Sequence, residues 1–369
     1  MEPLDTALLP AGIRSRMVEG VNGLTMHMLE AGEAGRPVLL LLHGFPELAY
    51  SWRKVMLPLA EAGFHVIAPD QRGYGRTIGW DDAYDADLRP FAMLNLVRDQ
   101  LALLGRLGIG PLHAVIGHDF GSPVAAHCAL VRPDIFRRVA MMSAPFPGAP
   151  PIGSSMRAPA RDIAAALAAL PRPRKHYHSY YATRPANADL MTAPDGLQAF
   201  FRAYYHHKSG DWAGNDVHPL QGWTAEELAK LPTYYVMDLA ETMPQTVAHE
   251  MPSAAAIAAC AWMTEPEMAV YAQEYGRSGF QGGLNGYRTR FTGTNMEMEA
   301  FAGARITVPA TFIGGARDWG VQQAPGALKA METTACADWR GTHAVPGAGH
   351  WVQQEKPAET VAALLDFLR

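Results

Sequence analysis

The sequence has few features that would place it in an oxidising compartment or a membrane. Only three of its 369 residues are cysteines, at positions 128, 260 and 336, and these have neither metal-ligand spacing nor the pattern of a disulfide framework. We therefore expect a cytoplasmic protein. No run of about eighteen apolar residues occurs, so we expect no transmembrane helix. The first five residues lack the basic region of a signal peptide, and we expect none.

Strong net charge is also missing. The chain has 31 basic and 36 acidic residues, a formal net charge of −5, and no long run of one sign. This balance predicts neither a nucleic acid nor a membrane surface as a partner, and leaves a homo-oligomer open. The pattern Gly-x-Ser-x-Gly occurs nowhere, which disfavours a serine esterase.

The remaining pattern alternates between short apolar runs and helical spacing. Continuous apolar runs of about five residues are typical of strands buried on both faces, and their alternation with helices predicts a doubly wound, mostly parallel sheet of the α/β class. The expected strands are residues 15–30 (two antiparallel strands), 37–42, 65–69, 112–116, 138–142, 306–314 and 342–345. The expected helices are residues 49–62, 91–107, 121–131 and 358–368.

One long interruption divides this alternation. Residues 146–303 are rich in Pro, Ala, Tyr and Met, with helical patches at 161–169 and 225–230. We predict a core formed by residues 1–145 and 304–369, with a mainly helical lid inserted between its two parts. Open α/β sheets bind ligands at the carboxyl ends of their strands, so an insertion on that side is expected to cover the site.

Residues 117–122 read Gly-His-Asp-Phe-Gly-Ser between an expected strand and an expected helix. Small residues on both sides of a reactive side chain in this position predict a nucleophile elbow, in which glycines relieve the crowding of a strained turn. Such elbows usually carry Ser or Cys, but here the reactive side chain is Asp119. A carboxylate is suited to displacing a leaving group from a saturated carbon, which would form an alkyl ester of the enzyme.

A nucleophile of this kind needs a base and an acid that orients the base. In this chain order the orienting acid follows the elbow and the histidine comes last. Asp318 follows one expected strand, and His350 lies in a glycine-rich loop after the final strand. Alone, Asp318 would fit a helix N-cap and His350 an ordinary loop. Their joint placement at strand ends favours a triad with Asp119.

Two backbone groups are candidates for an oxyanion hole. The N–H of Phe45 follows the first buried strand, and the N–H of Phe120 follows the nucleophile. In hydrolysis of an ester on Asp119, they would stabilise the tetrahedral anion formed when water attacks.

In these motifs the chain resembles the epoxide hydrolases of the α/β-hydrolase superfamily. The matching segments are His43-Gly44-Phe45-Pro46-Glu47, Asp70-Gln71-Arg72-Gly73-Tyr74-Gly75, Gly117-His118-Asp119-Phe120-Gly121 and Gly349-His350-Trp351. The resemblance implies an α/β-hydrolase fold with a helical lid, a small hydrophobic epoxide as substrate, and no cofactor. Two His pairs, at 176 and 178 and at 206 and 207, lack supporting carboxylates or cysteines, and we expect no metal.

The resemblance also implies two acid tyrosines in the lid. Gly282-Gly283-Leu284-Asn285-Gly286-Tyr287-Arg288 resembles the family segment that carries one of them, which assigns Tyr287. The segment His176-Tyr177-His178-Ser179-Tyr180-Tyr181 resembles the other, with Tyr177 as the matching residue. Phenol groups suit this reaction because epoxide opening develops an alkoxide that needs a proton. The chain departs from the family at Gly286, where an aromatic residue is usual, and in a lid lengthened around residues 206–255.

Two alternatives remain. A haloalkane or haloacid dehalogenase would use the same Asp-His-Asp triad, but the halide is usually held by a Trp after the nucleophile and by a second polar or Trp side chain. Phe120 and Phe45 occupy these positions, and no arginines flank Asp119 to hold a substrate carboxylate. A non-catalytic binding protein of this fold typically loses part of the triad, whereas this chain keeps all of it.

Overall fold

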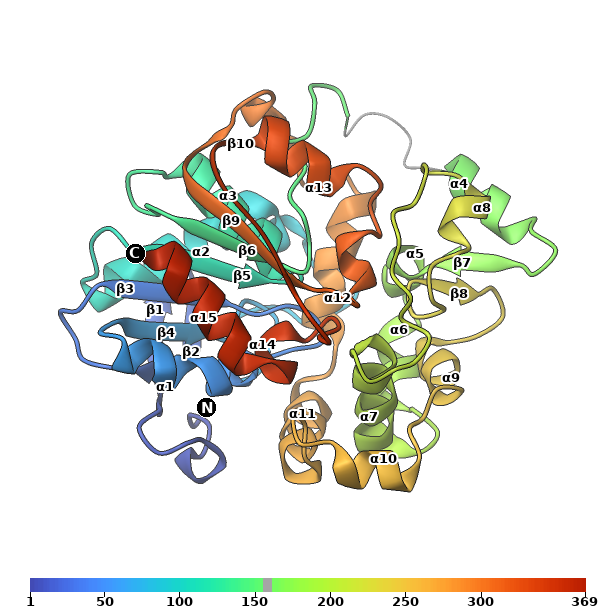
Figure 1. Cartoon of the computed structure of the whole chain (residues 1–369), viewed down its shortest axis with the longest axis horizontal. Coiled ribbons are helices and arrows are strands. Elements are labelled where there is room, and N and C mark those ends of the chain that lie inside the picture. Colours follow the sequence, from blue (N-terminus) through green and yellow to red (C-terminus); the bar gives the residue numbers. More distant parts are fainter. Residues whose placement is uncertain (155–160) are drawn as a thin grey trace.

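An eight-stranded sheet forms the centre of the computed structural model, which describes residues 1–154 and 161–369 (Figure 1). Residues 155–160 of the predicted insertion lie outside the described part. The strands run in the order β1-β2-β4-β3-β5-β6-β9-β10. Their bounds are β1 Arg14–Val21, β2 Leu24–Ala31, β3 Val38–Leu42, β4 His65–Pro69, β5 Ala114–His118, β6 Val139–Met142, β9 Ile306–Gly315 and β10 Cys336–Val345.

Strands β1 and β2 pair antiparallel at one edge, and β2 pairs antiparallel with β4. All other neighbours in this sheet pair in parallel. The predicted mostly parallel sheet with an antiparallel edge is therefore confirmed. The carboxyl ends of β3, β5, β6, β9 and β10 meet along one edge of the sheet.

Helices cover both faces of the sheet. Helices α2 (Met93–Leu107) and α3 (Gly121–Val131) pack together on one face, and α1 (Arg53–Glu61) and α15 (Pro357–Leu368) pack together on the other. Side chains of β3 alternate between the two cores: Leu39 and Leu41 join the core of α1, whereas Leu40 and Leu42 join the core of α3. This period of two explains why the β3 sequence is apolar at every position.

Several predicted boundaries were wrong by a few residues. The helix expected at 49–62 begins as the 3₁₀ turn Ala49–Trp52 before α1, and β5 extends to His118. The largest difference is β10, which begins at Cys336 rather than at residue 342. As an edge strand, β10 has many exposed polar positions, and an apolar run cannot reveal such a strand.

The segment between β6 and β9 contains mainly helices, which Figure 1 shows beside the sheet rather than within its layers. A short antiparallel pair, β7 (Arg174–His176) with β8 (Val236–Asp238), lies among them. The helices are α4 Arg161–Ala168, α5 Tyr177–Tyr181, α6 Ala186–Met191, α7 Gly196–Lys208, α8 Ala225–Leu228, α9 Met243–Ala248, α10 Ala254–Ala259, α11 Glu265–Ser278 and α12 Gln281–Arg288.

Helices α11 and α12 are fixed tightly to the core. A Cβ added to Gly282 of α12 would lie 2.0 Å from the carbonyl oxygen of Gly73, so the two backbones touch. On α11, Glu267 pairs with the buried guanidinium of Arg53 at 2.7 Å. These contacts set the position of α12, which carries Tyr287, relative to the sheet.

The elbow depends on a glycine at the start of α3. A Cβ added to Gly121 would lie 2.2 Å from the carbonyl oxygen of Leu42. We expect Gly121→Ala to lower the free energy of unfolding by about 1–3 kcal/mol, because rigid backbone would have to shift. Gly105→Ala in α2 is the matched control: nothing lies within 4 Å of its added Cβ, and it should raise stability by about 0.5–1 kcal/mol. Urea unfolding measures both, and equal stability of the two variants would contradict the close-approach argument.

Candidate active site

Asp119 stands at the turn between β5 and α3. Its φ of 49° lies in the left-handed region, which is uncommon for a residue other than glycine. The neighbouring chain is made of glycine where it passes closest: a Cβ added to Gly44 would lie 2.4 Å from Cβ of Asp119, and one added to Gly117 would lie 2.0 Å from the carbonyl oxygen of Gly121. The strained turn predicted for this motif is present.

The two carboxylate oxygens of Asp119 face different partners. The Phe45 N–H donates to Oδ1 at 2.9 Å, and Nε2 of His350 lies 3.3 Å from Oδ2. Asp119 itself is 8% exposed. Of the two predicted oxyanion-hole donors, Phe45 thus lies on the carboxylate. The N–H of Phe120 donates no hydrogen bond within the described part of the chain.

His350 follows β10, in the loop before α14 (Val352–Glu355). Its Nδ1 donates to Oδ1 of Asp318 at 3.0 Å, and its backbone N–H donates to the carbonyl of Lys208 at 2.9 Å. The ring is 1% exposed. The structure therefore brings Asp119, His350 and Asp318 into one chain of contacts.

Asp318 follows β9, and one of its carboxylate oxygens accepts two hydrogen bonds. Its Oδ1 accepts from the Gly320 N–H at 2.7 Å as well as from His350. The first bond caps the 3₁₀ turn Trp319–Val321, so the alternative interpretation of Asp318 as a cap also holds. This cap fixes the carboxylate that orients the His350 ring.

Asp119, Asp318 and His350 favour their charged forms although all three are buried. Burial raises the pKa of Asp119, but the His350 ring at 3.3 Å and its charge, with the charge of Lys208, outweigh it and hold this pKa well below its usual range. Burial and Lys208 lower the pKa of His350, yet Asp318 and Asp119 raise it above its usual value. For Asp318, His350 outweighs burial and the pKa is lowered.

Tyr177 and Tyr287 lie together above this group. Their ring centroids are 5.8 Å apart, and the Tyr287 ring lies 5.4 Å from that of Phe45, whose backbone contacts Asp119. The Tyr177 hydroxyl donates to Oε1 of Gln323 at 3.0 Å. Burial raises the pKa of both phenols well above the usual value, and the charge of Asp119 contributes in each case. Both phenols therefore stay protonated at neutral pH.

Gly286, the position at which the resemblance implies an aromatic residue, packs against Phe120, the residue after Asp119. A Cβ added to Gly286 would lie 2.9 Å from Cζ of Phe120. The Phe120 ring therefore occupies space that a side chain at 286 would need. The absence of a side chain at position 286 therefore leaves room for the phenylalanine at position 120.

Sequence reasoning missed a network beneath the triad. The buried carboxylate of Glu47 lies 2.6 Å from Nδ1 of His118, whose Nε2 donates to the carbonyl of His350 at 2.7 Å. Glu47 also accepts from the N–H of Gly44 at 3.0 Å. Glu47 and His118 both stood in the motifs quoted above, but only the folded arrangement shows that they support the backbone of His350.

Sequence reasoning also missed Lys208, the last residue of α7. It is 2% exposed, and its charge lowers the pKa of Asp119. Nothing in its neighbours, two histidines and a serine, indicates that it lies beside the triad.

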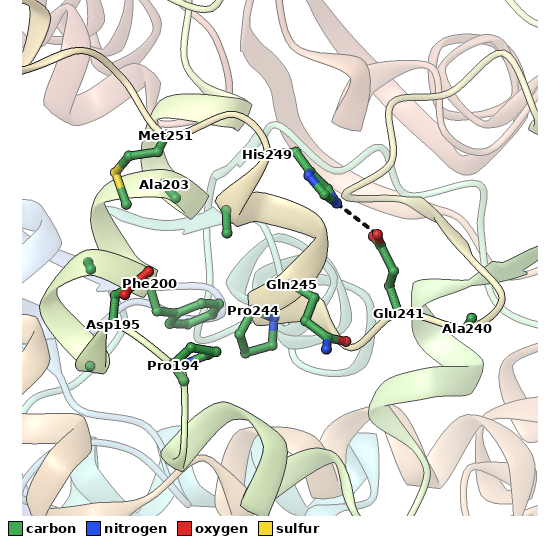
Figure 2. A pocket seen from close by; sticks show the side chains of 14 residues that line it. Pro194, Asp195, Phe200, Ala203, Ala240, Glu241, Pro244, Gln245, His249 and Met251 are labelled. Atoms are coloured by element: carbon green, nitrogen blue, oxygen red, sulfur yellow. Dashed lines mark hydrogen bonds and ion pairs between the residues drawn. The ribbon is translucent and has the colours of Figure 1, made fainter.

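A separate cavity of about 420 Å³ lies between α7 and α9 (Figure 2). Phe200, Pro244 and Met251 form part of its apolar wall, and His249 lies 2.7 Å from Glu241. No triad residue lines this cavity. It is distinct from the space beside Asp119.

No helix in residues 1–154 and 161–369 has the length and apolar character needed to cross a membrane. Within the same ranges, no group of three or more His, Cys, Asp and Glu side chains is arranged to hold a metal ion.

Residues 37–357 match the family model of the alpha/beta hydrolase fold, which confirms the predicted fold. The chain is 33% identical to epoxide hydrolase A of Mycobacterium tuberculosis (strain ATCC 25618 / H37Rv) over 360 residues, 96% of each protein. It also resembles the solved structure of an epoxide hydrolase from an endophytic Streptomyces, with a TM-score of 0.77, 31% identity and coverage of 97% of this chain and 96% of the other. The structure of epoxide hydrolase A from Mycobacterium thermoresistibile gives a TM-score of 0.74 at 33% identity, over 97% and 98% of the two chains.

The network beneath His350 can be tested by removing one charge. Glu47→Gln removes the buried carboxylate that lies 2.6 Å from Nδ1 of His118, and we expect the free energy of unfolding to fall by about 3 kcal/mol. Turnover should fall as well, because the carbonyl of His350 loses a fixed partner. The control is Glu33→Gln, whose side chain is 79% exposed in a surface pair with Arg36 and should change neither quantity. Urea unfolding and turnover are measured on both, and a Glu47→Gln variant indistinguishable from Glu33→Gln would contradict this role.

Proposed function

This chain belongs to the epoxide hydrolases of the alpha/beta hydrolase fold family, and from that premise we propose a covalent mechanism centred on Asp119. The enzyme is a hydrolase that acts on epoxides. In the proposed reaction an epoxide and one water molecule give a vicinal diol. The contact between Asp119, His350 and Asp318 is the observation that carries the mechanism.

In the first step, Oδ2 of Asp119 attacks a ring carbon of the epoxide. A carbon–oxygen ester bond forms, the ring carbon–oxygen bond breaks, and the ring oxygen leaves as an alkoxide that takes a proton. The lowered pKa of Asp119 supports this role, because the carboxylate is ionised at neutral pH. The Phe45 N–H holds the other oxygen and orients the attack.

In the second step, water attacks the carbonyl carbon of the ester. His350 takes the proton of this water, and Asp318 stabilises the imidazolium that results. The Phe45 N–H, and with it the predicted donor Phe120, would stabilise the oxyanion. Collapse of the tetrahedral intermediate breaks the ester bond. The two protons of the attacking water pass, through His350, to the departing alkoxide and to the phenolate left by the first step, so that the diol leaves with the carboxylate of Asp119 restored.

We assign the proton donors of the first step to Tyr287 and Tyr177. Their phenols are buried, protonated and adjacent, and the charge of Asp119 raises the pKa of both. Both come from residues 146–303, which we propose act as a lid over the carboxyl edge of the sheet. Burial beneath this segment excludes bulk water and strengthens the hydrogen bonds to a developing alkoxide.

The dehalogenase alternative gains no support from the site. The side chains at 45 and 120 are phenylalanines, which offer no N–H or O–H to a departing halide. The Phe45 ring instead packs against Tyr287 and Tyr181. Two phenols near the nucleophile match an alkoxide leaving group better than a halide, because the alkoxide needs a proton.

The covalent step can be tested by trapping the ester. His350→Gln should accumulate an alkyl ester on Asp119, because alkylation proceeds while hydrolysis stops. Intact-protein mass spectrometry after incubation with styrene oxide should show the added mass, and Asp119→Asn should show neither adduct nor diol. His249→Gln, a substitution of an exposed surface histidine, is the control and should turn over without an adduct. Diol formation by Asp119→Asn at the rate of the unmodified protein would contradict the mechanism.

The acid role of Tyr287 predicts a kinetic effect on the first step. Tyr287→Phe should slow alkylation about tenfold or more, because the alkoxide loses a proton donor. Tyr180→Phe is the matched control: this nearby tyrosine donates to Asp189 at 2.9 Å instead, and its loss should leave alkylation unchanged. Single-turnover kinetics with styrene oxide gives both rates. If the two variants alkylate equally fast, the acid is another group.

A further inference from the structure

Lys208 is a buried cation enclosed by aromatic rings. Its ammonium lies 5.0–5.7 Å from the ring centroids of four side chains, and the residue is 2% exposed. The rings belong to Tyr204, Tyr234, Tyr235 and Trp351. Such rings attract a cation through their negative faces, but they do not replace a counter-ion.

No carboxylate pairs directly with Lys208 in the described part of the chain. Its charge nevertheless acts on both reacting groups, because it lowers the pKa of Asp119 and opposes the raised pKa of His350. An ammonium taken out of water costs several kcal/mol unless it is compensated. In the resting site, the ionised Asp119 supplies part of this compensation.

This compensation disappears during the proposed reaction. When Asp119 becomes an ester it loses its charge, and Asp318 remains paired with His350. A neutral epoxide would then leave Lys208 buried with one negative group fewer to offset it. An epoxide that carries its own carboxylate would supply the missing charge. Lys208 would also offset the repulsion between that carboxylate and Asp119 as the substrate approaches.

We propose that Lys208 binds a carboxylate of the substrate, and that the substrate is an oxirane carboxylic acid with the acid group next to the ring. The inference rests on the proposed function and narrows its substrate class. The short spacing follows because the Trp351 ring lies 5.2 Å from the Lys208 ammonium and 4.7 Å from the ring of His350. The carboxylate is not consumed: the oxirane acid and one water give a dihydroxy acid by the same two steps.

One polar group of the same cluster lacks a partner. The Tyr235 hydroxyl is buried and makes no hydrogen bond within the described residues. Its ring contacts both the Lys208 ammonium, at 5.0 Å, and the Tyr177 ring, at 5.1 Å. Buried hydroxyls are normally satisfied, so an unpaired one between Lys208 and a proposed acid tyrosine fits a second donor to the carboxylate.

The test compares an acid with its uncharged counterpart. The substrates are 3-phenyloxirane-2-carboxylate, the corresponding primary amide, and styrene oxide as a neutral reference. The unmodified enzyme should prefer the acid over the amide in kcat/KM by about tenfold or more, the effect of one hydrogen bond to a charged group. Lys208→Met should reduce this preference about tenfold, mainly through KM, and Lys208→Arg should retain part of it.

Lys175→Met is the matched control. Lys175 also comes from residues 146–303 and also lies over an aromatic ring, that of Tyr180 at 5.0 Å, but it is only half-buried and outside the site. Its loss should leave the preference unchanged. A measurement without any variant uses the alkene analogues: cinnamate should inhibit styrene oxide turnover at about one tenth of the concentration that cinnamamide requires.

The outcomes separate this inference from the proposed function. If Lys208→Met slows acid and amide equally, or if styrene oxide is hydrolysed with no preference for the acid, the carboxylate site is overturned while the epoxide hydrolase function stands. If none of the three epoxides gives a diol, the proposed function is overturned and the substrate class with it.

Discussion

A carboxylate that must stay charged while buried sets the main constraint on this molecule. Asp119 is mostly removed from water, and burial alone would favour its neutral form. The surrounding groups reverse this preference: the Phe45 N–H holds one oxygen, the His350 ring faces the other, and Lys208 adds a nearby positive charge. Each of these groups is itself buried and needs hydrogen-bond or charge partners of its own. Further residues of the structure are therefore involved in keeping Asp119 charged.

The fold meets this requirement at the edge where parallel strands end. Phe45 follows β3, Asp119 follows β5, Asp318 follows β9 and His350 follows β10, so four loops converge. Glycine supplies the close approach at the elbow, where any Cβ at 44 or 121 would collide with neighbouring atoms. Hydrogen bonds then fix the individual side chains, as when the cap on Asp318 also aligns His350.

The sequence predicted those parts of the molecule that local chemistry determines. Asp119 could be recognised because a nucleophile elbow has a glycine signature, and the buried strands because both of their faces are apolar. The start of β10 was missed because an edge strand carries polar residues. Lys208 could not be found in this way, since the rings around its ammonium come from positions 204, 234, 235 and 351 and meet only after folding. The Glu47–His118 contact joins two motifs that the sequence shows only as separate segments.

The order of the triad along the chain has a consequence for the growing polypeptide. Asp119 lies in the first part of the core, whereas Asp318 and His350 follow β9 and β10, which complete the sheet. A ribosome therefore makes the proposed nucleophile long before the proposed base and its orienting acid. Until β9 and β10 have been translated and added beside β6, Asp119 has neither the imidazole nor the closed surroundings that would let it complete a catalytic cycle. In the proposed mechanism, assembly of the last two strands is thus also the step that completes the catalytic site.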